Sequence, residues 1–150
     1  MFDTGRQTMP PLAKTLGKVT GGILLIVLAA AGSYAFDLCR RFPDLDMSRF
    51  RFGVASWYSE ADQHINVKTA SGETFDDEAM TCATWDYEFG EKLLVINALN
   101  GKWIICRVND RGPGKRLRRK IDLTKEAFRK IANLRRGLIY TVIIPTSKKK

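Results

Sequence analysis

The chain has 150 residues, of which 45% are hydrophobic and 27% charged, and its formal net charge is +9. This length and composition predict one globular domain and exclude a small fold that depends on metal or disulfide cross-links. The positive charge is concentrated in residues 111–150, which hold 14 Lys or Arg and 2 acidic residues. Such asymmetry indicates an anionic partner, which is a nucleic acid, a lipid surface or an anionic polymer.

Residues 1–36 are predicted to direct the chain to a membrane. A basic segment, residues 1–18, precedes the uncharged Val19–Phe36, whose apolar part has the length of a signal-peptide core. Small residues at Ser33 and Ala35 suit cleavage after Ala35. The 18 uncharged residues also suffice for an uncleaved signal anchor, and the remaining alternative is a buried helix of a soluble protein. Both membrane interpretations predict export to the periplasm or to the outer face of the cytoplasmic membrane.

A linker and a folded domain are expected next. Residues 37–51 contain Pro43 and mixed charges, which is typical of an irregular linker, and the domain is expected over residues 52–146, before a basic tail at residues 147–150. Runs of β-branched, apolar and aromatic residues bounded by turn residues predict strands. In the first half of the domain these are Gly53–Tyr58, Ala79–Thr84, Glu91–Asn97 and Lys102–Val108, with a hairpin at Asn100-Gly101 between the last two.

The second half of the domain predicts two strands around a helix. Ile121–Leu123 leads into a helix from about Lys125, with Thr124 as its N-cap residue and Gly137 at its end. Leu138–Pro145 predicts the last strand. Six short strands and one short helix, without regular βαβ alternation, favour a mainly β fold and a small β-barrel.

One predicted strand ends at a carboxylate. Trp103–Pro113 begins with apolar β-forming residues and is stopped by Gly112-Pro113, which places Asp110 at the strand end. Strand ends present reactive groups to solvent on a rigid scaffold, so Asp110 is the first candidate for chemistry. The alternative is that Asn109 and Asp110 only hydrogen-bond the backbone of their own turn.

A series of short motifs runs through the domain in a fixed order. They are Gly53–Tyr58, Thr69–Glu73 with Phe75-Asp76, Met80-Thr81, Phe89-Gly90, Arg107–Pro113 and Ile121–Leu123. Together they resemble the rare lipoprotein A (RlpA-like) family, from Gly53 to about Pro145. The resemblance implies a six-stranded double-psi β-barrel related to those of expansins. It also implies an endolytic lytic transglycosylase, which cleaves MurNAc-GlcNAc bonds of peptidoglycan glycan strands with 1,6-anhydro products, and it places the family acid at Asp110.

That chemistry is possible with one carboxyl group in place of the usual pair. The acid protonates the bridging oxygen and then takes the proton of the muramyl C6 hydroxyl, which closes the anhydro ring. Partial desolvation or a neighbouring carboxylate helps to keep such an acid protonated. By the resemblance, Glu73 and Asp76 line the same groove, although both also suit solvated turn acids. Asn109 and Arg111 flank Asp110 and are expected to support it or to contact substrate, with Arg111 on the opposite strand face.

The sequence departs from the family at Thr84. The resemblance implies a His at this position in active members, whereas the hydroxyl of Thr hydrogen-bonds but carries no charge near neutral pH. The single His of the chain, His64, lies in a predicted loop, either as a surface residue or as a substrate contact. A non-catalytic, expansin-like glycan-binding barrel therefore stays open beside the enzyme.

Four further side chains carry two interpretations each. Trp57 and Tyr58 end the first strand and either stack on sugar rings or belong to the core. Cys82 and Cys106 lie in predicted strands and form either a disulfide or buried free thiols.

The sequence predicts no metal and no other cofactor, because it contains no His or Cys cluster with metal-ligand spacing and no glycine-rich phosphate loop. The basic patch Lys115–Lys120 does not indicate nucleic acid in an exported protein. It is expected to face anionic lipid headgroups, cell-wall carboxylates or only solvent. The expected partners are peptidoglycan glycan strands and, through the N-terminal segment, the membrane.

Overall fold

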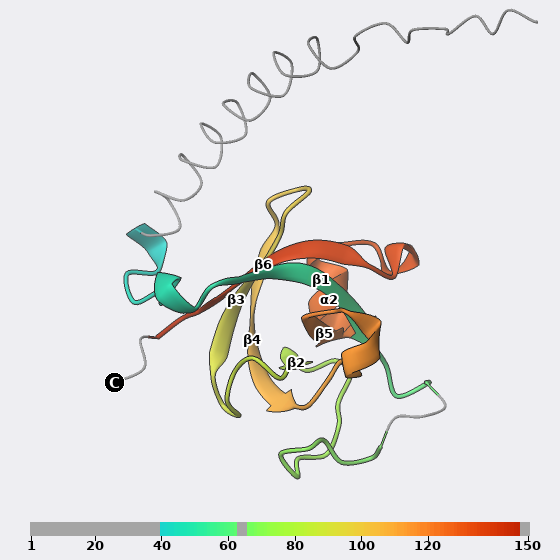
Figure 1. Cartoon of the computed structure of the whole chain (residues 1–150). Helices are drawn as coiled ribbons and strands as arrows, with labels where there is room; N and C mark the ends of the chain where they lie inside the picture. Colours follow the sequence, from blue (N-terminus) through green and yellow to red (C-terminus); the bar gives the residue numbers. More distant parts are fainter. Residues whose placement is uncertain (1–39, 63–65, 148–150) are drawn as a thin grey trace, which may run out of the picture. The chain divides into compact units, whose positions relative to one another are not determined.

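The computed structural model describes residues 40–62 and 66–147. The residues from Asp44 onward form one compact unit that contains a closed six-stranded barrel (Figure 1). Around the barrel the strands follow the order β1-β5-β2-β4-β3-β6. Their bounds are β1 Arg51–Tyr58, β2 Thr81–Ala83, β3 Lys92–Asn97, β4 Trp103–Asp110, β5 Ile121–Thr124 and β6 Ile139–Pro145. The expected mainly β fold and small barrel are confirmed.

The barrel mixes parallel and antiparallel pairs. Strands β1 and β5 are parallel, as are β2 and β4, whereas the other neighbouring pairs are antiparallel. The predicted hairpin joins β3 to β4, and Gly101 adopts a φ of 70° in its turn. Strand β4 ends at Asp110, as the motif at Trp103–Pro113 predicts, and so runs two residues beyond the apolar run Lys102–Val108. As a consequence, Asn109 and Asp110 are held by strand pairing rather than by a free turn.

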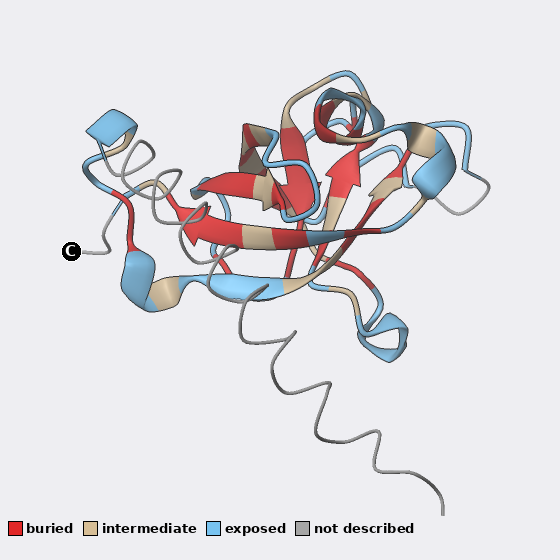
Figure 2. Cartoon of the chain, turned by 90° about the horizontal axis from the view of Figure 1, so that it is seen from above, coloured by how far each residue is buried: buried red, intermediate tan, exposed pale blue. Residues whose placement is uncertain are grey.

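Alternating apolar residues fill the inside of the barrel. Along β4, Ile104, Cys106 and Val108 are buried between less buried neighbours, which is the period of two expected for a strand. Figure 2 shows buried residues along the strands and in the helix α2, while the connecting loops are mainly exposed. Each large apolar side chain buried in this way contributes about 1.5–3 kcal/mol to the free energy of unfolding.

Helix α2, Lys125–Ile131, packs against β1, β4 and β5. It is shorter than predicted, because the chain becomes extended at Ala132, and Gly137 instead follows the 3-10 helix η3, Leu134–Arg136. Thr124 is the N-cap residue, but its hydroxyl donates to the carbonyl of Ala79 at 2.6 Å rather than capping the helix. Thr124 is therefore confirmed as the N-cap residue, although its side chain bonds the segment before β2 rather than the helix.

The compact unit also includes residues that the sequence suggested as linker. The 3-10 helices η1, Met47–Arg49, and η2, Lys115–Leu117, flank the barrel strands β1 and β5 in sequence. Leu45 is buried, and the N–H of Asp46 donates to the carbonyl of Pro145 at 2.9 Å. Residues 44–50 therefore belong to the barrel unit.

The predicted signal peptide or anchor in residues 1–36 lies outside the described residues. Within residues 40–62 and 66–147, no helix has the length and apolar character needed to cross a membrane.

Candidate functional site

Asp110 ends strand β4 and is partly exposed. Its Oδ1 atom accepts two backbone N–H groups, from Ala70 and from Arg111, each at 2.8 Å. Among the described residues no hydrogen bond is formed to the other oxygen, Oδ2. The carboxyl group is therefore fixed in orientation by one oxygen while the second is available to a ligand.

The side chain of Arg111 turns away from this carboxyl group. Its Nη1 donates to the carbonyls of Thr84 and Tyr87, both at 2.8 Å, and its guanidinium lies 3.8 Å from the ring centroid of Phe89. Through these bonds the guanidinium connects the segment after β2 to the end of β4. The predicted placement of Arg111 away from the acid agrees with this geometry, and the side chain supports the site through the backbone.

A second carboxyl group, Asp122 on β5, lies close to the first. Strand β2 runs between β4 and β5, and its residue Ala83 pairs with both Asp110 and Asp122. Burial raises the pKa of Asp122, and the charge of Asp110 raises it further. A hydrogen bond from the Ser56 hydroxyl and the charge of Arg119 oppose that rise. The barrel therefore places a carboxyl group with a raised pKa beside Asp110.

Sequence reasoning did not select Asp122 as a site residue. It stands between the buried Ile121 and Leu123, so the strand period alone places its side chain on the other face. That alternation was the available signal for a site role. Its neighbourhood with Asp110, however, depends on the order of strands around the barrel, which local patterns do not encode.

Glu73 lies in the loop before β2 and is bound to β4. Its two carboxylate oxygens accept from Arg107 Nη1 at 2.6 Å and Nη2 at 2.8 Å, and Asn109 Nδ2 adds a third bond at 3.0 Å. The Arg107 bonds, followed by the Asn109 bond, lower the pKa of Glu73 to about 2. Because Arg107 compensates its charge, Asp122 rather than Glu73 is the carboxyl group that responds electrostatically to Asp110.

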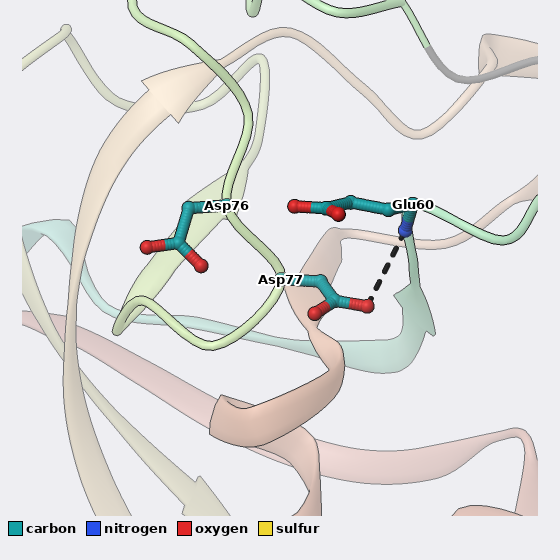
Figure 3. Close-up of side chains that lie close together, drawn as sticks. All are labelled: Glu60, Asp76 and Asp77. Atoms are coloured by element: carbon teal, nitrogen blue, oxygen red, sulfur yellow. Dashed lines mark hydrogen bonds between the residues drawn. The ribbon is translucent and has the colours of Figure 1, made fainter.

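Asp76 belongs to a group of three carboxylates, with Glu60 and Asp77, whose oxygens lie within 4.8 Å of one another (Figure 3). Asp76 accepts from the N–H of Glu78 at 2.9 Å, and Asp77 accepts from the N–H of Glu60 at 3.3 Å. These bonds are typical of acidic residues that stabilise turns. The absence of a metal site stays a prediction, and the structure gives Asp76 a turn role.

Thr84, at the position where the resemblance implies His, is fully buried. Its hydroxyl donates to the carbonyl of Lys120 at 3.0 Å and accepts from the N–H of Asp86 at 3.2 Å. Both hydrogen-bonding capacities of this side chain are thus used by the backbone. Thr84 shapes the segment beside Asp110, and its hydroxyl does not face a ligand.

Of the two aromatic residues at the end of β1, Tyr58 is buried and Trp57 is half-buried against the core. Tyr58 is buried and stacks on Phe75 with ring centroids 4.7 Å apart, and Trp57 Nε1 donates to the carbonyl of Leu134 at 3.2 Å. The hydroxyl of Tyr58 is buried without a hydrogen-bond partner among the described residues, and burial strongly raises its pKa. This packing favours the core interpretation for Tyr58, whereas Trp57 is only half-buried, so its two interpretations stay open.

Cys82 and Cys106 are buried free thiols on the paired strands β2 and β4. Cys106 Sγ donates to Cys82 Sγ at 3.0 Å, so the two side chains are direct neighbours. Whether they are oxidised to a disulfide stays a prediction. His64 lies outside the described residues.

Comparisons with known proteins agree with the fold. Residues 51–143 match the family model described as lytic transglycolase. Two relatives are each named probable endolytic peptidoglycan transglycosylase RlpA. The relative from Nostoc sp. is 41% identical over 86 residues, which are 57% of this chain and 23% of that protein. The relative from Synechocystis sp. is 35% identical over 135 residues, or 86% of this chain and 38% of that protein.

A solved structure shares the fold. It is a mutant expansin of Clavibacter michiganensis in complex with cellohexaose, with a TM-score of 0.52, 20% identity, and coverage of 67% of this chain and 52% of that chain. The chain spans less than half the length of the two curated relatives. The family model covers most of the chain, including the barrel strands from β1 into β6. The chain therefore belongs to the lytic transglycolase family of RlpA-like double-psi β-barrel domains.

Proposed function

We propose that this protein is a peptidoglycan lytic transglycosylase in which Asp110 is the catalytic acid and base. The observation that carries the proposal is the carboxyl group of Asp110, which is fixed through Oδ1 by two backbone N–H groups and presents Oδ2 at the partly exposed end of β4. The names of the relatives supply the substrate class, peptidoglycan, and the family resemblance implies that the bond cleaved is MurNAc-GlcNAc. A substrate in the cell wall implies that the barrel is exported.

In the first step, protonated Asp110 donates its proton to the glycosidic oxygen while the bond from muramyl C1 to that oxygen breaks. The C6 hydroxyl of the same sugar then attacks C1, and its proton passes to the Asp110 carboxylate. The products are a free 4-hydroxyl group on one fragment and a 1,6-anhydro ring on the other. No water is consumed, and Asp110 ends the cycle as it began, so one carboxyl group suffices for both proton transfers.

Asp122 is proposed as a positioning residue. It is mostly buried, accepts from the Ser56 hydroxyl, and lies 3.5 Å from Arg119 Nε, so it is held away from direct contact with a polymer. Two neighbouring carboxyl groups resist simultaneous ionisation, which favours retention of one proton by the pair. Because burial raises the pKa of Asp122, this carboxyl group is the one that favours its protonated form beside Asp110.

Parallel Asp110→Asn and Asp122→Asn variants test these roles on soluble glycan strands. Asp110→Asn is expected to lower the cleavage rate by at least about 100-fold, because general acid–base catalysis contributes that much or more. Asp122→Asn is expected to retain activity but to change the pH dependence of kcat, since the coupled ionisation is gone. Wild-type activity in Asp110→Asn contradicts the catalytic role, and an unchanged pH profile in Asp122→Asn contradicts the positioning role.

A second candidate function is a glycan-binding barrel without catalysis. The observation that favours it is Thr84, which supplies no imidazole and whose hydroxyl is used by the Lys120 carbonyl. In that case Asp110 and its neighbours hydrogen-bond sugar hydroxyls. Co-sedimentation of the protein with purified cell wall, without any cleavage at high protein concentration, is the result that selects this function.

A further inference from the structure

We propose that a pocket beside Asp110 is a subsite for an anionic sugar unit, in which the sugar ring stacks on Trp85 and its carboxylate binds Lys115 and Arg118. The pocket, here called the Trp85 pocket, has a volume of about 380 Å³. It is lined by Trp85, Pro113, Lys115, Arg118, Arg119 and Lys120, together with one acidic residue, Asp86. The inference rests on the proposed function, because it assigns a subsite to the same glycan strand.

Trp85 has the properties of a binding platform. Its side chain is 54% exposed, although a large aromatic residue is normally buried. The indole Nε1 donates to the carbonyl of Pro113 at 2.9 Å, so the exposed ring is fixed in place. The C–H groups of a pyranose carry partial positive charge and pack on the negative face of such a ring.

Two cations in the pocket lack acidic partners. Arg119 lies 3.5 Å from Asp122, and Lys120 lies 3.3 Å from Asp86. Lys115 and Arg118, in contrast, form no ion pair with any of the described residues. Their charges are therefore available to a ligand, and a carboxylate is the group that pairs best with both ammonium and guanidinium.

The geometry places the unpaired cations next to the platform. Lys115 Nζ lies over the Trp85 ring, 5.4 Å from its centroid. A sugar that stacks on this face therefore displaces the flexible Lys115 side chain, whose ammonium then pairs with the carboxylate of that sugar. Arg118 adopts a left-handed backbone conformation, with a φ of 52°, at the end of η2. Non-glycine residues held in this conformation cluster at functional sites. A ring with an attached acid would thus meet apolar and charged contacts together.

The Trp85 pocket adjoins the candidate acid along the chain and across the strands. Trp85 follows Thr84, whose N–H donates to the carbonyl of Asp110 at 3.2 Å, and Pro113 lies three residues after Asp110. The proposal requires that a strand of linked sugars bound at Asp110 extends over this platform. An aromatic platform within the basic cluster favours a saccharide over a lipid headgroup, which needs cations alone.

Two groups of the cell wall supply the carboxylate in question. One is the lactyl carboxylate of muramyl units in strands without peptides, and the other is a carboxylate of the peptide stem. Binding is measured in an Asp110→Asn background, so that no ligand is cleaved. The ligands are peptide-free glycan strands, stem-bearing strands and neutral chitooligosaccharides, with vesicles containing anionic phosphatidylglycerol as a fourth arm.

The Lys115→Gln/Arg118→Gln double variant is expected to bind at least one carboxylate-bearing strand about tenfold more weakly or worse, since charge-assisted bonds are lost. Its affinity for the neutral oligosaccharide should stay within about twofold of the parent's, because this ligand has no carboxylate to bond the removed cations. The better-bound strand identifies the source of the carboxylate. Trp85→Ala should weaken the binding of all three saccharide ligands. Trp85→Phe, which keeps an aromatic ring, should recover part of the lost affinity.

Arg135→Gln/Arg136→Gln is the matched control, because it removes the same charge from exposed residues of η3 outside the pocket. The inference is overturned if this control loses as much affinity as the pocket variants or if the pocket variants bind as the parent does. It is also overturned if their loss of affinity is confined to the vesicles. Binding that depends on the pocket without cleavage by the wild type leaves the subsite in place and removes the catalytic proposal. If the wild type cleaves glycan but its binding does not depend on the pocket, the catalytic proposal stands and the subsite is removed.

Discussion

Three carboxyl groups near the end of β4 differ in what compensates their charge. Glu73 is paired with Arg107, Asp110 accepts two backbone N–H groups, and Asp122 is buried beside Asp110. At the scale of single residues, the environment rather than the residue type therefore distinguishes a structural acid from a reactive one.

The pKa of Glu73 tests whether its carboxyl group is a structural one. Its value of about 2 lies below the ordinary 4.5, so the stabilising contribution of Glu73 is present above pH 4.5 and is lost as the pH falls towards 2. In Arg107→Gln the pKa is expected to return close to its ordinary value, because the largest cause is removed. Carboxyl chemical shifts followed by NMR during an acid titration report both values. An unchanged pKa in the variant contradicts the ion pair.

Substitution of Thr84 tests whether its hydroxyl stabilises the fold. Thr84→Val keeps the shape but leaves the carbonyl of Lys120 and the N–H of Asp86 without their partner. The free energy of unfolding is expected to fall by about 1–3 kcal/mol, the cost of unsatisfied buried groups. Urea denaturation measures it, with Thr84→Ser as the control that retains the hydroxyl. A smaller loss for Val than for Ser contradicts the structural role.

At the scale of elements, local patterns predicted all six strands of the barrel and the start of α2. They worked because β-branched and apolar residues alternate between glycine and other turn residues, as in Trp103–Val108. The end of the helix was missed, since Leu134 continues the apolar spacing. There the chain leaves the helix at Ala132, and the Asn133 side chain accepts from the N–H of Arg135 to start a 3-10 turn. Such a local capping choice is weakly encoded by apolar spacing.

Helix α2 contributes to stability through its buried face. Phe128 is fully buried against the barrel, so Phe128→Ala is expected to lower the free energy of unfolding by about 3–5 kcal/mol through lost burial and a cavity. Arg129→Ala, on the exposed face, removes a surface ion pair and should cost less than about 1 kcal/mol. Thermal and urea unfolding of both variants compare the two faces. Equal losses contradict the packing of α2.

At the scale of the whole molecule, barrel closure brings together groups that the sequence keeps apart. Asp110 was predicted from its motif and its strand end, whereas Asp122 and the Trp85 pocket depend on which strands and loops become neighbours. Non-local pairing of this kind follows from topology and not from residue patterns. The same closure places Cys82 and Cys106 side by side in the core.

Reactivity of the two core thiols reports the integrity of the barrel. Burial raises the pKa of the Cys82 thiol well above its ordinary value, and thiolate is the reactive form. The Cys39→Ser substitution removes the third cysteine of the chain, so that only Cys82 and Cys106 can react. In this variant, kept reduced, a water-soluble thiol reagent is expected to modify neither cysteine until denaturant is added, when both react. Rapid modification of the folded chain contradicts the closed core, and failure to react in denaturant without reductant identifies the disulfide.

The central claim is cleavage at Asp110 without water. Purified peptidoglycan is digested by the full-length chain in ¹⁸O-labelled water, and the soluble fragments are separated and weighed by mass spectrometry beside an Asp110→Asn control. We expect fragments with 1,6-anhydro ends, each lighter than the hydrolysed fragment by one water and free of label, and we expect none of them in the control. Labelled reducing ends, or anhydro products that persist in Asp110→Asn, contradict it.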